Sequence, residues 1–121
     1  MSRTTRPQSR PSALRSRRLS TRRLDELIEQ AIVDAYGPAE QAVGFHATLE
    51  QKLALPFNTV VFGVTVSVRK LDVTSRGEVV AVCYRGRERS LIPLVDLPLP
   101  DPPPAGWEWV DAYRRWARGA L

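Results

Sequence analysis

The chain has 121 residues, which is enough for one domain with its own hydrophobic core and without disulfide or metal support. Hydrophobic residues make up 43% and charged residues 26%, values typical of a globular protein, so the chain is not disordered throughout. No apolar run reaches the roughly 20 residues that cross a bilayer, and no signal-like apolar stretch follows the N-terminus. We therefore expect a cytoplasmic protein without a membrane partner. The single cysteine, Cys83, excludes an internal disulfide and a cysteine-based zinc cluster.

The formal net charge of +5 comes from the N-terminal segment. Eight of the 18 Lys and Arg residues lie in the first 23 positions, where there is no Asp or Glu. Subtracting these eight leaves ten basic and 13 acidic residues, a net charge of −3 for residues 24–121. We predict a disordered basic arm over residues 1–22 and a single α+β domain over residues 23–121. The Arg side chains of such an arm either bind the phosphates of nucleic acid weakly, or the arm has no function of its own.

Two helices are predicted after the arm. Apolar residues recur with helical spacing from Leu24 to Ala35, and Ser20 or Thr21 can cap this helix. Gly37 is expected as its C-cap, and Pro38 as the first residue of a second helix. The apolar face of the second helix consists of Ala42, Phe45, Leu49 and Leu53.

The hydrophobic period changes to two after the second helix. It predicts one long strand from about Thr59 to Arg69, with a bulge or bend at Gly63. A second strand follows at 78–84, a tight turn at Arg85-Gly86, and a third strand at about 87–94. These strands predict a small, curled antiparallel sheet that resembles an SH3-like barrel if it closes. The predicted buried face of the first strand consists of Val60, Phe62, Val64, Val66 and Val68.

The last third of the chain is predicted to cover the domain. Six of the ten prolines lie between Pro93 and Pro104, where neither a helix nor a central strand can form. We expect an extended strap packed against its own domain. A terminal helix follows, and its aromatic face is expected to pack on the core, the alternative being an exposed partner surface. That face consists of Trp109, Ala112, Tyr113 and Trp116.

Little in the sequence supports catalysis. The only histidine, His46, has Glu50 one helical turn later but no nucleophile marked beside it, so we expect a surface or packing residue and not an enzyme. Cys83 lies in an apolar strand and is expected to be buried and inert. Ca²⁺ needs only oxygen ligands, and there is no EF-hand loop. Asp34 and Glu40 flank the Gly37-Pro38 turn, where they either converge on one cation with freed helix-end carbonyls or serve in capping.

Several motifs together resemble a known family. The residues that carry the resemblance are 34–41, Gly44-Phe45, Leu49-Glu50, Leu55-Pro56-Phe57, Arg85-Gly86-Arg87, 92–97, Trp109 and 113–116. The chain from about residue 24 to 117 is similar to the CcbP type of small calcium-binding proteins, first described in cyanobacteria. The resemblance implies a cytoplasmic, non-EF-hand protein that binds Ca²⁺ through surface carboxylates, as a buffer or sensor. A metal-independent protein-interaction module and nucleic-acid binding through the arm stay open as alternatives.

Overall fold

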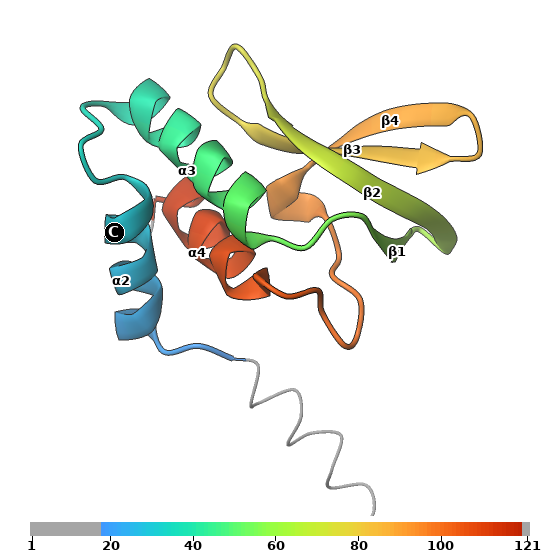
Figure 1. Cartoon of the computed structure of the whole chain (residues 1–121), viewed down its shortest axis with the longest axis horizontal. Coiled ribbons are helices and arrows are strands. Elements are labelled where there is room, and N and C mark those ends of the chain that lie inside the picture. Colours follow the sequence, from blue (N-terminus) through green and yellow to red (C-terminus); the bar gives the residue numbers. More distant parts are fainter. Residues whose placement is uncertain (1–17, 120–121) are drawn as a thin grey trace, which may run out of the picture.

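The computed structural model describes residues 18–119 and has the predicted α+β architecture (Figure 1). Most of the predicted arm, residues 1–17, lies outside this part, as do residues 120–121. No helix within residues 18–119 is both long and apolar enough to cross a bilayer. The elements are α2 (Thr21–Ala31), α3 (Pro38–Lys52), β1 (Phe57–Val61), β2 (Val64–Val73), β3 (Val79–Arg85), β4 (Glu88–Pro93), a 3₁₀ turn (Leu94–Asp96) and α4 (Trp107–Ala117).

The helix hairpin is confirmed, but its first helix is displaced from the predicted limits. Ser20 caps α2, because its Oγ accepts a hydrogen bond from the backbone N–H of Arg23 at 3.1 Å. The helix thus begins at Thr21, inside the segment that we assigned to the arm. It ends at Ala31 and not near residue 35, and Gly37 is the N-cap of α3, not the C-cap of α2. Pro38 is the first residue of α3, as predicted.

The predicted first strand is in fact a hairpin. Phe62 and Gly63 have φ values of 50° and 76° and form a two-residue turn between β1 and β2. The first two strands pair around this turn with Val61 opposite Val64, so residues 59 and 66 share one face. Thr59 is therefore buried and Val60 exposed, which reverses the predicted faces of β1. In β2 the prediction is correct, since Val66 and Val68 are buried.

The sheet is an open antiparallel meander of order β1-β2-β3-β4. Because β1 pairs only with β2 and β4 only with β3 within the described residues, the sheet does not close into an SH3-like barrel. The irregularity in β2 lies between Val68 and Lys70, where the register with β3 shifts, and not at Gly63. The third strand is apolar on both faces, as predicted, and residues 79–83 are all buried.

The helices gather at one end of the molecule, and the free ends of the hairpins project from the other (Figure 1). Helix α3 contacts β2 and β3, while α4 contacts both α2 and α3. The ring of Phe45 lies 5.5 Å from that of Tyr113 and 5.3 Å from that of Trp116, measured between centroids. The aromatic face of α4 therefore belongs to the core, as predicted, and is not a free partner surface.

The proline-rich strap packs against its own domain, as predicted. Leu97 is fully buried, and the Thr59 hydroxyl donates to the carbonyl oxygen of Pro98 at 2.6 Å. The guanidinium of Arg114 donates to the carbonyl oxygens of Leu94 and Leu97. These hydrogen bonds satisfy backbone groups that a proline-rich segment cannot pair within a sheet.

Candidate metal centre

The corner between α2 and α3 depends on two residues with positive φ. Asp34 has a φ of 67° and Gly37 a φ of 107°. Asp is one of the few L-residues that adopt the left-handed region readily, and Gly does so without steric cost. The backbone N–H of Ala35 donates to the Ile32 carbonyl at 3.0 Å, which closes the turn. The local sequence thus places the exposed carboxylate of Asp34 on the turn that leads into α3.

Glu40 lies on the other side of this corner, in the first turn of α3. Its Oε1 accepts a hydrogen bond from the backbone N–H of Tyr36 at 2.7 Å. The positive end of the helix dipole also favours a carboxylate at this position. Glu40 therefore has the capping role that the sequence suggested as an alternative. Asp34 has no hydrogen bond or ion pair with any other described side chain.

The donor atoms of this corner suit Ca²⁺ in kind, but they are few. Within residues 18–119, no three side chains of Asp, Glu, His or Cys lie close enough together to hold a metal ion. All 13 acidic residues belong to this part of the chain. Because Ca²⁺ takes six to eight oxygen ligands, a site at Asp34 and Glu40 would need backbone carbonyls and water to complete its shell.

Three further carboxylates lie on different elements. Each of them was also considered as a possible calcium ligand. Asp72 is on β2, and its Oδ1 accepts the backbone N–H of Val73 at 2.8 Å. Asp96 is in the 3₁₀ turn near Arg114; burial lowers the pKa of that guanidinium, and the charges of Asp111 and Asp96 oppose the effect. Glu78 lies in the loop before β3. In the part of the chain that the structure describes, none of these three carboxylates belongs to a group of three or more Asp, Glu, His or Cys side chains that could hold a metal ion.

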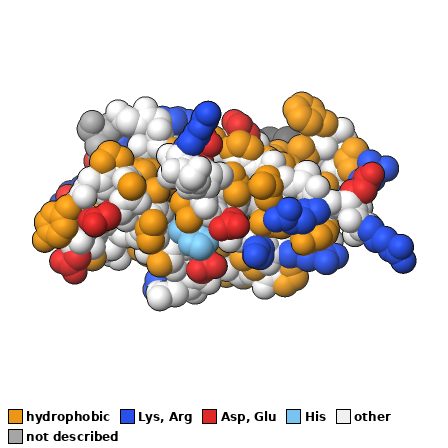
Figure 2. Space-filling view, turned by 90° about the horizontal axis from the view of Figure 1, so that it is seen from above, with side chains coloured by type: hydrophobic (Ala, Val, Ile, Leu, Met, Phe, Trp, Pro, Cys, Tyr) orange, Lys and Arg blue, Asp and Glu red, His pale blue; other side chains and the backbone are white. Residues whose placement is uncertain are grey.

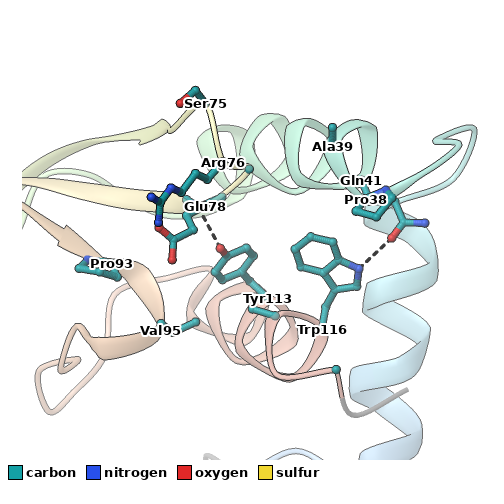
Figure 3. Close-up of a pocket in the computed structure, with 14 residues that line it drawn as sticks. Pro38, Ala39, Gln41, Ser75, Arg76, Glu78, Pro93, Val95, Tyr113 and Trp116 are labelled. Atoms are coloured by element: carbon teal, nitrogen blue, oxygen red, sulfur yellow. Dashed lines mark hydrogen bonds between the residues drawn. The ribbon is translucent and has the colours of Figure 1, made fainter.

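A hollow opens beside the start of α3, between this helix, the loop at 75–78 and α4 (Figure 3). At its floor the hydroxyl oxygen of Tyr113 accepts the backbone N–H of Val79 at 2.9 Å. Burial raises the pKa of Tyr113. The indole N–H of Trp116 donates to Oε1 of Gln41 at 2.9 Å. Since Pro38 also lines the hollow, the hollow and the corner share the first turn of α3.

The other reactive side chains are engaged or buried. Nε2 of His46 lies 3.1 Å from the carbonyl oxygen of Leu71 and 3.5 Å from Oε2 of Glu50. The imidazole thus joins α3 to β2, which is the packing role that we predicted. Cys83 is completely buried, and its burial raises the pKa of the thiol. A buried thiol with a raised pKa is a poor nucleophile and a poor metal ligand.

Comparison with known proteins identifies the family. Residues 25–117 match the CcbP family, which is described as calcium binding. The chain belongs to this family. The matched region contains the α2–α3 corner, all four strands and α4. CcbP membership was therefore correctly predicted from the sequence.

Two solved structures share the CcbP fold. The crystal structure of Anabaena CcbP superimposes with a TM-score of 0.67 at 20% sequence identity, covering 85% of this chain and 96% of that one. A calcium-binding protein in its calcium-binding form has a TM-score of 0.65 at 19% identity, with 84% and 98% covered. At this identity the likeness shows the fold alone. No protein with a curated description matches the chain significantly.

Proposed function

We propose that this protein binds Ca²⁺ at the α2–α3 corner, through the carboxylates of Asp34 and Glu40. The observation that carries the proposal is the match to a calcium-binding family over residues 25–117, a range that includes the corner. The second support is chemical, because both residues offer the carboxylate oxygens that Ca²⁺ prefers.

The structure suggests how the two carboxylates would act. Asp34 is exposed and without a partner in the described part of the chain, so it can turn toward a cation at little cost. Glu40 uses Oε1 to accept the Tyr36 N–H, which leaves Oε2 for the ion. A bound Ca²⁺ would supply charge neutralisation between these two groups. With only two carboxylates, we expect a dissociation constant on the order of 10⁻⁴ M.

Calorimetric titration of Ca²⁺ into the full chain tests this proposal, with Mg²⁺ as the competing ion. Because two unit charges interact with about 1 kcal/mol at 4 Å in water and Ca²⁺ carries two, Asp34→Asn or Glu40→Gln should weaken binding by about tenfold or more. Glu88→Gln is the matched control, since Glu88 is an exposed carboxylate in the β3–β4 hairpin. Wild-type affinity in the Asp34 and Glu40 variants would show that the site lies elsewhere.

A measurement at the hollow can distinguish a calcium buffer from a calcium sensor. Gln41, which accepts the hydrogen bond from Trp116, directly follows Glu40 in the first turn of α3. If the protein is a sensor, engaging Glu40 should shift this turn and change the fluorescence of Trp116. A buffer should bind Ca²⁺ without such a change. Trp116→Phe identifies the signal, because the other two tryptophans stay in place.

The hollow also favours a second candidate function, a protein-interaction module that needs no metal. Its apolar walls include Pro38 and Pro93, and the carboxylate of Glu78 lies at its rim without an ion pair among residues 18–119 (Figure 3). A peptide that inserts an apolar side chain and pairs a cation with Glu78 would fit this surface. Binding that is lost in Glu78→Gln and is unchanged by EDTA would favour this function over the calcium site.

The remaining proposals concern location and chemistry. We propose a cytoplasmic protein without catalytic activity. The contacts of His46 support the absence of catalytic activity, because its Nε2 is directed at the Leu71 carbonyl and at Glu50. A screen for hydrolysis of ester and phosphate substrates tests it, and activity lost in His46→Gln would contradict it.

A further inference from the structure

The two free hairpin turns lie at the same end of the molecule. In an up-and-down meander, the β1–β2 turn and the β3–β4 turn must come together, opposite the β2–β3 turn. Figure 1 shows both turns projecting away from the helices. A hollow between the two hairpins is lined by Val61 and Val64 from one and by Arg85, Arg89 and Ile92 from the other. We call this end, residues 60–64 and 85–89, the hairpin tip.

Phe62 is an unusual residue for its position. Two-residue hairpin turns of this kind require positive φ at both residues and favour Asn, Asp or Gly, whereas a bulky aromatic residue is disfavoured there. Phe62 has a φ of 50°, and its exposed fraction is 101%. Its side chain thus contributes nothing to the core. The turn requires this backbone conformation but not an aromatic side chain, so the presence of Phe at a strained position points to a functional cause.

Another apolar side chain and several basic side chains share the tip with Phe62. Val60, two residues before Phe62 in β1, is 53% exposed. The β3–β4 hairpin carries exposed Arg85, Arg87 and Arg89 against a single acid, Glu88, which leaves a net charge of 3 − 1 = +2. None of these three Arg residues forms an ion pair with another described residue.

The positive charge of the tip is part of a wider separation of basic and acidic side chains on the surface. Lys and Arg side chains gather over the strand end of the face seen in Figure 2, and acidic side chains are frequent toward the helices. Arg69 and Lys70 on β2 extend the basic region, and the guanidinium of Arg69 lies 4.4 Å from the ring centre of Tyr84. The tip therefore combines protruding apolar side chains with unpaired positive charge.

We propose that the hairpin tip binds the surface of a membrane that contains anionic phospholipids. Phe62 and Val60 would enter the boundary between headgroups and acyl chains, and the Arg side chains would contact lipid phosphates. Nucleic acid also attracts Arg, and Phe62 can stack on a base, but aliphatic Val60 cannot, so the apolar pair favours lipid. Binding of this kind needs no membrane-spanning helix.

Sedimentation of the full chain with vesicles tests the proposal, in EDTA so that the result does not depend on the calcium site. Vesicles of phosphatidylcholine with phosphatidylserine should bind the protein, and vesicles of phosphatidylcholine alone should bind it much more weakly. Phe62→Ser should weaken binding by about tenfold, and Arg87→Gln and Arg89→Gln by about fivefold each.

Two controls keep the result specific to the tip. Tyr36→Ser removes a side chain that is 83% exposed at the opposite end and should leave binding unchanged. Phe62→Trp keeps an aromatic side chain and should retain binding. The basic arm is present in every variant, so it cannot produce these differences. Wild-type binding by Phe62→Ser, or binding of single-stranded DNA without vesicle binding, would overturn the proposal.

Discussion

Gly44 of α3 lies against Ala31 at the end of α2, and Gly44→Ala should destabilise the protein. An added Cβ would lie 2.6 Å from the carbonyl oxygen of Ala31, a backbone atom that cannot rotate away. Restoring an ordinary contact of 3.4 Å requires a shift of 3.4 − 2.6 = 0.8 Å between the helices. Overpacking of this kind costs about 1–3 kcal/mol, and the better helix propensity of Ala offsets about 1 kcal/mol of it.

We therefore expect Gly44→Ala to lower the free energy of unfolding by up to about 2 kcal/mol, measured by urea denaturation. The midpoint of thermal unfolding should fall by up to roughly 10 °C for a domain of this size. Val43→Ala is the control, since Val43 is the exposed neighbour of Gly44 and its replacement should change stability by less than about 0.5 kcal/mol. A Gly44→Ala protein more stable than wild type would refute the close approach of the two helices.

Two further predictions concern α4. Burial raises the pKa of Tyr113 in the folded state. Its contribution to the free energy of unfolding is therefore complete below the unfolded pKa of about 10 and is lost as the pH rises through the folded pKa. Tyr113→Phe should cost about 1 kcal/mol at pH 8 through the lost Val79 hydrogen bond. The stability difference between wild type and variant should shrink above pH 10, and a constant difference would contradict this. The partly exposed ion pair between Arg115 and Asp25, 2.8 Å long, should contribute at most about 1 kcal/mol in a double-mutant cycle, and a larger coupling would show a more desolvated pair.

The helices and the core were predictable because their apolar spacing is regular. Phe45 and Leu49 recur on one helical face, and both are fully buried. The end of α2 was not predictable in the same way, since Ile32 and Ala35 continue the apolar spacing beyond the helix. Asp34 takes a positive φ that no helix accommodates, and the residue pattern does not reveal that conformation.

The β1–β2 hairpin was missed for a related reason. The residues directly before and after a two-residue turn, Val61 and Val64, face the same side of the sheet. The side to which even-numbered residues point therefore changes across the turn. Because Val60 and Val64 are both apolar, the sequence does not show this change. Phe62 is also not a residue that signals such a turn. The candidate metal site was predicted as a pair of carboxylates flanking a corner, but not the 2.7 Å bond that engages Glu40 with Tyr36. Such side-chain contacts depend on corner dihedral angles, and the sequence alone does not specify them.

The backbone amide of Tyr36 offers the most direct test of the calcium site, because its hydrogen bond to Glu40 must respond when that carboxylate binds an ion. The measurement is a titration of the ¹⁵N-labelled full chain with Ca²⁺, followed by amide chemical shifts, with Mg²⁺ as the control. We predict saturable shifts that are largest at Tyr36 and its neighbours in the corner and that Mg²⁺ does not reproduce. Shifts confined to other elements, or no saturable shift at the corner, would contradict the assignment of the site.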